Sequence, residues 1–254
     1  MKTSHWYNKQ GEAVFEVPKA SGGGMRPTTL ADARKLGLLP SVTTILGIID
    51  KPQLVDWKVK QAIQACFDTR PTGTLEEYTK AMQAKSEEQV GDAADLGTAI
   101  HAALEAAFAG KSFDQDMLRY VTPTLNKVAD AGIKLVEHEL RLVNAHDGYA
   151  GTTDAVMVDA QGRQGILDFK SRKTKPGQKC TPWETEPMQI AAYARSKFGF
   201  LNGIVGANVY ISTTEVGRVE IITYTSEELF EAWSGFLGAS MLWSYIKGYK
   251  PAVT

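Results

Sequence analysis

The chain has 254 residues, of which 43% are hydrophobic and 22% are charged, and its formal net charge at pH 7 is −1. This size and composition support a substantial core, in one large domain or in a domain with an added lobe. The near-neutral charge excludes a strongly basic surface, so any contact with nucleic acid has to come from local patches.

The cysteine count and the hydropathy pattern narrow the class of protein. Cys66 and Cys180 are the two cysteines of the sequence, too few for a four-thiolate zinc or iron–sulfur site, so we expect no iron–sulfur cluster. The first residues lack the apolar core of a signal peptide, and the sequence contains no long apolar run. We therefore expect a soluble cytoplasmic protein that makes no contact with a membrane.

The first half of the chain is predicted to be mainly helical after a short hairpin over residues 5–20. Pro52 favours the first turn of a helix that runs towards Phe67. Three further segments follow: a loop and a charged helix over 68–90, an alanine-rich helix over 92–109, and a helix over 114–131. We expect residues 1–90 to form an N-terminal extension and residues 91–254 to form the core domain.

The second half changes to strand composition. Strands are predicted over 133–143, 149–158, 165–169, 204–212 and 218–224, with a helix over 183–198 between the third strand and the fourth. Thr225 and Glu228 form a capping-box pattern that begins a last helix. Along it a stripe at helical spacing is expected to face the core, namely Phe230, Trp233, Leu237 and Met241. The fold class expected is α/β, with a mixed central sheet flanked by helices.

Two carboxylates and a lysine stand at a suggestive spacing in these strands. Asp154 is followed after thirteen residues by Asp168-Phe169-Lys170, and the polar turn over 161–164 lies between them. An Asp-x-Lys triplet alone is common on the wet face of a strand, but this one ends an apolar run, where charges rarely lack a partner. A hairpin would bring both carboxylates to one place, and Asp168 and Lys170 share a face. Carboxylate oxygens suit Mg²⁺, and an ammonium beside them suits phosphodiester hydrolysis.

Other polar residues can be placed relative to these strands. His101 lies on the helix over 92–109, and Glu139 lies on the strand before Asp154, where Glu137 shares its face. Gln189 and Tyr193 are four residues apart and hence on one face of their helix. A basic segment follows the Asp168 strand, with Lys170, Arg172, Lys173, Lys175 and Lys179.

Together these residues resemble the PD-(D/E)xK nuclease superfamily, in particular its RecB-like branch. The matching motifs occur in the order Gly97-Thr98-x-x-His101, Glu139, Gly151-x-x-Asp154, Asp168-Phe169-Lys170 and Gln189-x-x-x-Tyr193. The N-terminal run over 40–46, with Lys51-Pro52 and Trp57, is similar to that of phage-type exonucleases related to the mitochondrial genome maintenance exonuclease. The resemblance implies a restriction-endonuclease-like core.

The resemblance also implies a role for each matched residue. Asp154, Asp168 and the Phe169 carbonyl would bind Mg²⁺ or Mn²⁺, with His101 as a further ligand. Lys170 would position or activate the attacking water. Glu139 would orient the site or hold a second ion. The helical pair Gln189 and Tyr193 would contact DNA or brace Lys170.

The activity implied is that of a metal-dependent exonuclease acting on ends of single-stranded DNA. Arg172, Lys173, Lys175 and Tyr193 would contact the nucleic acid, and the N-terminal extension could form a cover over the site. Replication or recombination proteins are the expected partners, in the host cytoplasm if the gene is carried by a phage. Two alternatives remain: a structure- or site-specific endonuclease that cuts duplex DNA, and an inactive nucleic-acid-binding module on the same fold.

Overall fold

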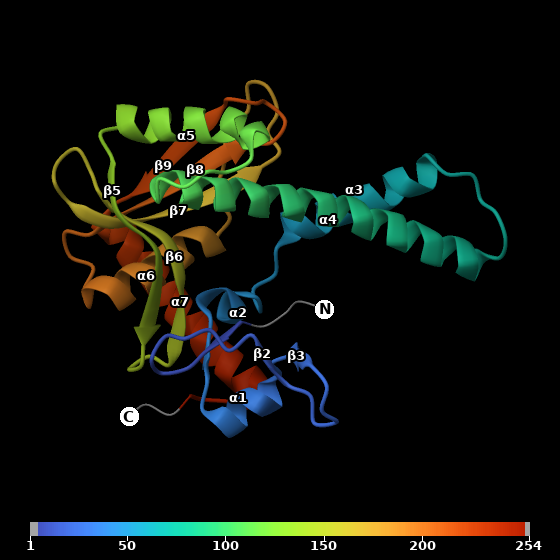
Figure 1. Ribbon diagram of the computed structural model, residues 1–254, viewed down its shortest axis with the longest axis horizontal. Helices are drawn as coiled ribbons and strands as arrows, with labels where there is room; N and C mark the ends of the chain where they lie inside the picture. The colour runs from blue at the N-terminus through green and yellow to red at the C-terminus, as the bar shows by residue number, and fades with distance from the viewer. Residues whose placement is uncertain (1–4, 252–254) are drawn as a thin grey trace. The chain divides into compact units, whose positions relative to one another are not determined.

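A computed structural model of the protein describes residues 5–251, apart from the side chains of residues 53, 86–90 and 92–93. The chain divides into two compact units, one made of Met1–Ile49 with Thr122–Thr254 and the other of Asp50–Val121 (Figure 1). The boundary expected after residue 90 falls inside a single helix, α4 (Leu75–Phe108). The first 49 residues share a unit with the sheet, because they pack against its strands and its last helix.

A five-stranded mixed sheet forms the centre of the first unit. Its order is β5 (Lys134–Asn144), β6 (Tyr149–Val158), β7 (Gln164–Arg172), β8 (Val205–Ser212) and β9 (Val219–Tyr224). Strands β7 and β8 run parallel, joined through helix α6 (Thr185–Phe198), and all other neighbours are antiparallel. The sheet is flanked by helices (Figure 1), as the strand and helix patterns predicted.

Helices α6 and α7 (Ser226–Lys247) bury their apolar sides in the main core. Thr225 accepts a hydrogen bond from the Glu228 amide in the expected capping box. The expected core stripe of α7 is wrong at Phe230 and Met241, whose side chains are 63% and 75% exposed. The expectation is correct at Trp233, which is buried. The core side is turned away from Phe230 and Met241, and its buried large side chains are Leu229, Trp233, Phe236 and Trp243.

The N-terminal residues join the sheet unit through short strands and helices. Their elements are β1 (Trp6–Tyr7), β2 (Glu16–Pro18), β3 (Met25–Pro27), α1 (Leu30–Leu36), β4 (Leu39–Pro40) and α2 (Val42–Leu46). The hairpin expected over 5–20 forms next to its turn, where Tyr7 pairs antiparallel with Ala13 and the Val14 amide donates to the Trp6 carbonyl. The longer pairings are different, because β1 also pairs with β4 and β2 pairs with β3. Both strands of the β1–β4 pair are buried. The apolar partner that buries β1 is β4, which lies beyond residue 20 and so outside the expected hairpin.

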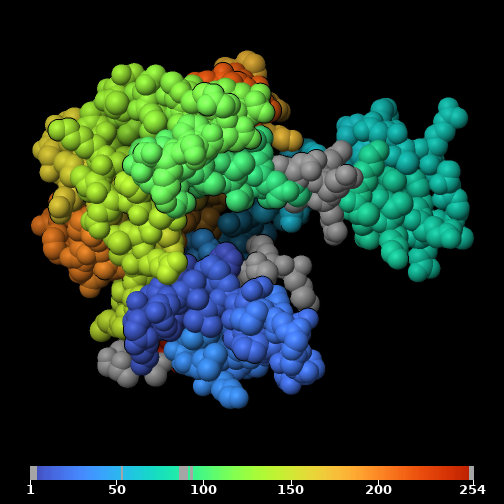
Figure 2. All heavy atoms as spheres, in the orientation of Figure 1, coloured from blue at the N-terminus to red at the C-terminus, as the bar shows by residue number. Residues whose placement is uncertain are grey.

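Aromatic and polar contacts fix this N-terminal segment to α7. The Trp6 ring packs against Trp243 and Tyr249, with centroid separations of 6.1 and 6.2 Å. The Tyr249 hydroxyl donates to the carbonyl of Leu38 at 2.7 Å. In Figure 2 the N-terminal residues, drawn in blue, lie directly against the yellow-green surface of β5 and β6.

The second unit is helical. It contains α3 (Pro52–Phe67), which has the predicted bounds, and α4, which joins the two helices expected before and after residue 91. A short 3₁₀ turn, Gln115–Met117, precedes α5 (Leu118–Asp130), which leads back to the first unit. Within the described part of the chain, none of the helices has the length and apolar character needed to cross a bilayer.

Candidate active site

The candidate site lies where β6 and β7 separate. Their ladder of paired residues runs from Val158 opposite Gln164 to Ala155 opposite Leu167 and no further, although both strands continue. Asp154 follows directly past that last pair, and its Oδ2 accepts a hydrogen bond of 2.7 Å from the Phe169 amide. The Asp154 carboxylate therefore accepts the Phe169 N–H bond where the β6–β7 backbone ladder has ended. This bond fixes the carboxylate beside the Asp168–Phe169 peptide.

Asp168 and Lys170 form an ion pair at the same fork. The Lys170 ammonium lies 2.6 Å from Asp168 Oδ2, as expected for residues two apart on one face of a strand. Burial works to lower the pKa of Lys170, but the charges of Asp168 and Asp154 outweigh it and leave that pKa raised. Lys170 is therefore an ammonium at neutral pH, with both carboxylates close enough to act on it.

Gln189 connects the two members of this ion pair. Its Oε1 accepts a hydrogen bond of 3.1 Å from the Lys170 ammonium, and its Nε2 donates one of 3.1 Å to Asp168 Oδ1. The amide matches its donor to the carboxylate and its acceptor to the cation. The predicted neighbourhood of Asp154, Asp168, Lys170 and Gln189 is thus realised in one cluster.

Asn208 and Tyr224 belong to the cluster and escaped the sequence interpretation. Asn208 stands opposite Asp168 in the parallel ladder of β7 and β8, and its amide nitrogen lies 3.3 Å from Asp168 Oδ2. The Tyr224 hydroxyl donates to Asn208 Oδ1 at 2.8 Å. The signal available in the sequence was a lone amide inside the apolar run of β8, since a buried amide requires hydrogen-bond partners.

Tyr193 lies deep against β6. It is 3% exposed, and a Cβ added to Gly151 would come within 2.7 Å of its ring carbon Cε1. Glycine at 151 is thus what allows the ring to lie on the strand. Burial, together with the charge of Asp168, raises the pKa of Tyr193 well above its ordinary value. This buried position favours the bracing role predicted for Tyr193 over the predicted contact with DNA.

Glu139 lies on the neighbouring strand β5, where it is exposed. The pairs on either side, His138 with Ala155 and Leu140 with Thr153, put Glu139 opposite Asp154. Its φ of 48° is the one positive value among the non-glycine residues that the structure describes, and such backbone strain is concentrated at functional sites. The alternative, Glu137, is engaged elsewhere, in a 2.6 Å ion pair with Lys197 of α6.

Arg172 is held inward. Its guanidinium pairs with the buried Glu186 of α6 and lies 4.7 and 4.6 Å from the ring centroids of Trp183 and Tyr210. Glu186 also accepts hydrogen bonds from the Tyr210 hydroxyl and the Trp183 amide. Arg172 therefore ties the end of β7 to the start of α6, and its predicted contact with nucleic acid would have to compete with Glu186.

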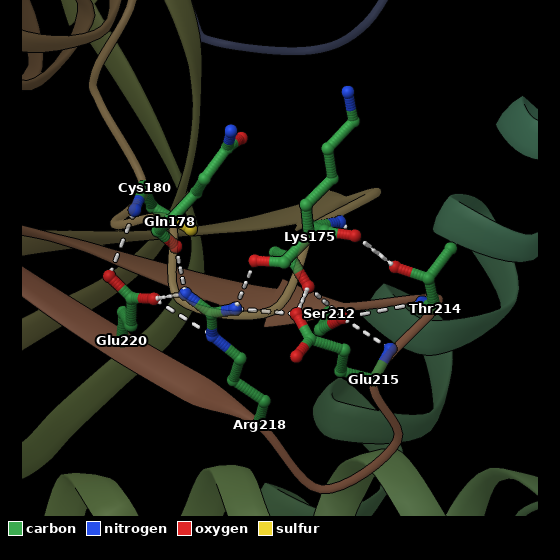
Figure 3. Close-up of polar contacts among 9 residues, drawn as sticks. Lys175, Gln178, Cys180, Ser212, Thr214, Glu215, Arg218 and Glu220 are labelled. Atoms are coloured by element: carbon green, nitrogen blue, oxygen red, sulfur yellow. Dashed lines mark hydrogen bonds and ion pairs between the residues drawn. The ribbon is translucent and has the colours of Figure 1, made fainter.

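The remaining basic residues lie on a loop that is tethered to β9 (Figure 3). The Arg218 guanidinium donates to the carbonyls of Lys175 and Gln178, and it pairs with the carboxylates of Glu215 and Glu220. Figure 3 shows the Lys175 ammonium pointing away from this network. Lys173 is also exposed. The loop thus presents exposed cations on a backbone that Arg218 holds through the Lys175 and Gln178 carbonyls.

His101 lies on α4 and belongs to the second unit. The four motif residues of the cluster, Asp154, Asp168, Lys170 and Gln189, all belong to the first unit. The prediction that His101 is a metal ligand therefore stays a prediction.

The donor set of the cluster fits a hard divalent cation. Among the described residues, no group of three or more His, Cys, Asp or Glu side chains is arranged to hold a metal. The fork instead offers two carboxylates, Asp154 of β6 and Asp168 of β7. The backbone carbonyl of Phe169 follows Asp168 directly on β7. Mg²⁺ is commonly bound by one or two carboxylates, with water and substrate phosphate completing its shell.

Comparison with known proteins leaves the family open. No protein-family model matches the chain, and no curated protein matches it. One solved structure, described as the crystal structure of SSO0001, aligns with 13% identity over 73% of this chain and 86% of that chain. The TM-score of 0.29 is too low for that likeness to carry an argument about fold or function.

Proposed function

We propose that the protein is a metal-dependent deoxyribonuclease with a restriction-endonuclease-like core, acting as an exonuclease on the ends of single-stranded DNA. The observation that carries the proposal is the cluster at the β6–β7 fork. Two carboxylates and an ammonium gather there from positions 154, 168 and 170, in contact with an amide from α6. The ordered resemblance to the PD-(D/E)xK motifs supports the same assignment, and Mg²⁺ or Mn²⁺ is the cofactor proposed.

Each residue of the cluster has a distinct task in this proposal. Asp154, Asp168 and the Phe169 carbonyl would hold the cation, which when bound lowers the pKa of water and offsets charge on the phosphate. Lys170 stabilises the negative charge that develops on the phosphate oxygens, because it stays an ammonium in a partly buried place. Gln189 keeps Lys170 and Asp168 in position through its two hydrogen bonds.

The substrate would approach along the basic loop. Lys173, Lys175 and Lys179 are exposed there and can pair with phosphates, an interaction that weakens as salt increases. Arg172 and Tyr193 would not contact the substrate directly. Arg172 would hold the start of the loop against α6 through Glu186, and Tyr193 would hold α6 against β6 at Gly151. Single-stranded ends and a covering role for the N-terminal extension are proposed from the resemblance.

The test uses end-labelled linear single strands with Mg²⁺ or Mn²⁺, with and without chelator. We expect degradation that the chelator abolishes, and a loss of at least about 100-fold in rate for Asp168→Asn and for Lys170→Met. Asp159→Asn is the matched control, because Asp159 lies in the surface turn and pairs with Arg163. Full activity of the Asp168 or Lys170 variant in the presence of metal would overturn the proposal.

Circular substrates separate the alternatives. Circles that resist while linear strands are degraded support an exonuclease, and rapid cutting of circles or of duplex DNA indicates an endonuclease. Binding of DNA without any chelator-sensitive degradation would assign the chain to the inactive nucleic-acid-binding modules.

A further inference from the structure

The outer face of α7 carries a row of large apolar side chains that no part of the described chain covers well. Met241 is 75% exposed, Tyr245 is 85% exposed and Phe230 is 63% exposed, and Leu242 and Ile246 are more than half exposed. Their spacing places them along one side of the helix. Scattered exposed apolar residues are ordinary, but a contiguous row on one helix is typical of an interaction surface.

This face has no charge along most of its length. From residue 232 to residue 246 the helix contains no Asp, Glu, Lys or Arg. Gly238 stands in the middle of the row, and a Cβ added there would meet nothing within 4 Å. The helix therefore offers an apolar surface with a shallow point at its centre, where a second helix can approach closely.

The two ends of α7 carry opposite charges. Exposed acidic residues surround its beginning: Glu227, Glu228 and Glu231. The exposed cations Lys247 and Lys250 stand at its other end, and Arg34 adds a third by donating to the carbonyls of Lys247 and Gly248. A partner that matches this surface must be apolar in the middle, basic over the first end and acidic over the second.

We propose that this surface binds a second copy of the chain, with two α7 helices packed antiparallel about a two-fold axis at Gly238. A two-fold contact pairs a surface with itself, so the acidic end of each helix meets the basic end of the other. With the axis at Gly238, Phe230 lies opposite Ile246 of the second copy, and Ser234 lies opposite Leu242. The fork between β6 and β7 takes no part in this contact.

Sedimentation velocity of the full chain, over micromolar to hundred-micromolar concentrations, tests the proposal. We expect a monomer–dimer equilibrium that Tyr245→Glu and Met241→Lys each weaken by at least about tenfold, because both bury a charge within the apolar contact. Phe200→Ser is the control, since Phe200 is 56% exposed on the loop after α6 and should leave the dimer unchanged. Circular dichroism checks that every variant is folded.

A charge exchange tests the antiparallel orientation and the identity of the partner together. Glu231→Lys and Lys250→Glu should each weaken association, and the chain that carries both should recover it, because each end again meets its opposite. A wild-type chain that stays monomeric throughout the range overturns the proposal, as does association that Tyr245→Glu leaves intact. Binding of a monomer to neutral phosphatidylcholine vesicles, lost in Tyr245→Glu, would assign the surface to lipid and overturn it equally.

Discussion

Asn208 stands opposite Asp168 across the parallel strands β7 and β8, and its amide nitrogen donates to Asp168 Oδ2 over 3.3 Å. Both side chains are buried. The Tyr224 hydroxyl donates to Asn208 Oδ1, so the amide oxygen is occupied and the amide nitrogen has to face the carboxylate. Tyr224 thus sets, through Asn208, the surroundings of an aspartate that we propose binds the metal.

Tyr224→Phe should destabilise the protein. The variant removes one hydroxyl and leaves Asn208 Oδ1 buried without its donor, which costs about 1–3 kcal/mol in free energy of unfolding. Urea unfolding followed by circular dichroism measures the loss. Thr223→Val, at the exposed neighbouring position of the same strand, should change stability by no more than about 0.5 kcal/mol. Equal stabilities for Tyr224→Phe and the wild type would show that the hydroxyl does not support Asn208.

Gln189→Leu should reduce turnover more than substrate binding. The substitution removes the amide that connects Lys170 with Asp168, so we expect kcat to fall by about 10- to 100-fold while KM changes little. Steady-state degradation of labelled single strands measures both. Ser196→Ala is the matched control on the same helix, because the Ser196 hydroxyl donates to the Ala192 carbonyl one turn away. A change in KM alone would assign Gln189 to DNA binding.

Gly151→Ala should disturb the packing of Tyr193 on β6. The new methyl group would lie 2.7 Å from Cε1 of a buried ring, and we expect a loss of about 1–3 kcal/mol in free energy of unfolding. Gly91→Ala is the control, since that helical position has no atom within 4 Å and alanine favours a helix. Thermal and urea unfolding compare the two. If Gly151→Ala proved as stable as the wild type, the close contact would have no energetic importance.

Arg218→Gln should loosen the basic loop in a pH-dependent way. Despite burial, the Cys180 amide and Arg218 lower the pKa of Glu220, and hydrogen bonding from Thr174 with the charge of Arg218 lowers that of Glu215. A carboxyl group whose pKa is lowered on folding stabilises the folded protein at pH values above its ordinary pKa, here 4.5. This stabilisation is lost as the pH falls through the lower pKa that the group has in the folded protein. The difference in stability between wild type and variant should therefore be complete at pH 7 and should decrease as the pH falls below 4.5.

Tryptic cleavage after Lys179 and the thermal midpoint report the state of this loop. At pH 7 the variant should be cut faster and melt lower than the wild type, because Arg218 no longer donates to the Lys175 and Gln178 carbonyls. Arg163→Gln removes an ion pair in a distant turn and should leave cleavage after Lys179 unchanged. A thermal difference that grew on acidification would contradict the assigned direction of the pKa shifts.

Local patterns in the sequence were sufficient for most individual elements. Strand alternation placed Asp168 and Lys170 on one face, and the structure joins them in an ion pair. Proline at residue 52 and the capping box at Thr225 located the starts of α3 and α7. These signals depend on backbone geometry within a few residues, so they are readable without knowledge of the fold.

Long-range pairing decided the rest. The partner of β1 is β4, more than thirty residues away, and the Asn208–Asp168 contact exists only because β8 lies parallel to β7. Periodicity shows that a helix has an apolar side but not which side its neighbours cover, so Phe230 and Met241 of α7 were misplaced. Register and coverage depend on which surfaces meet in three dimensions, and that is a property of the whole chain and not of any single segment.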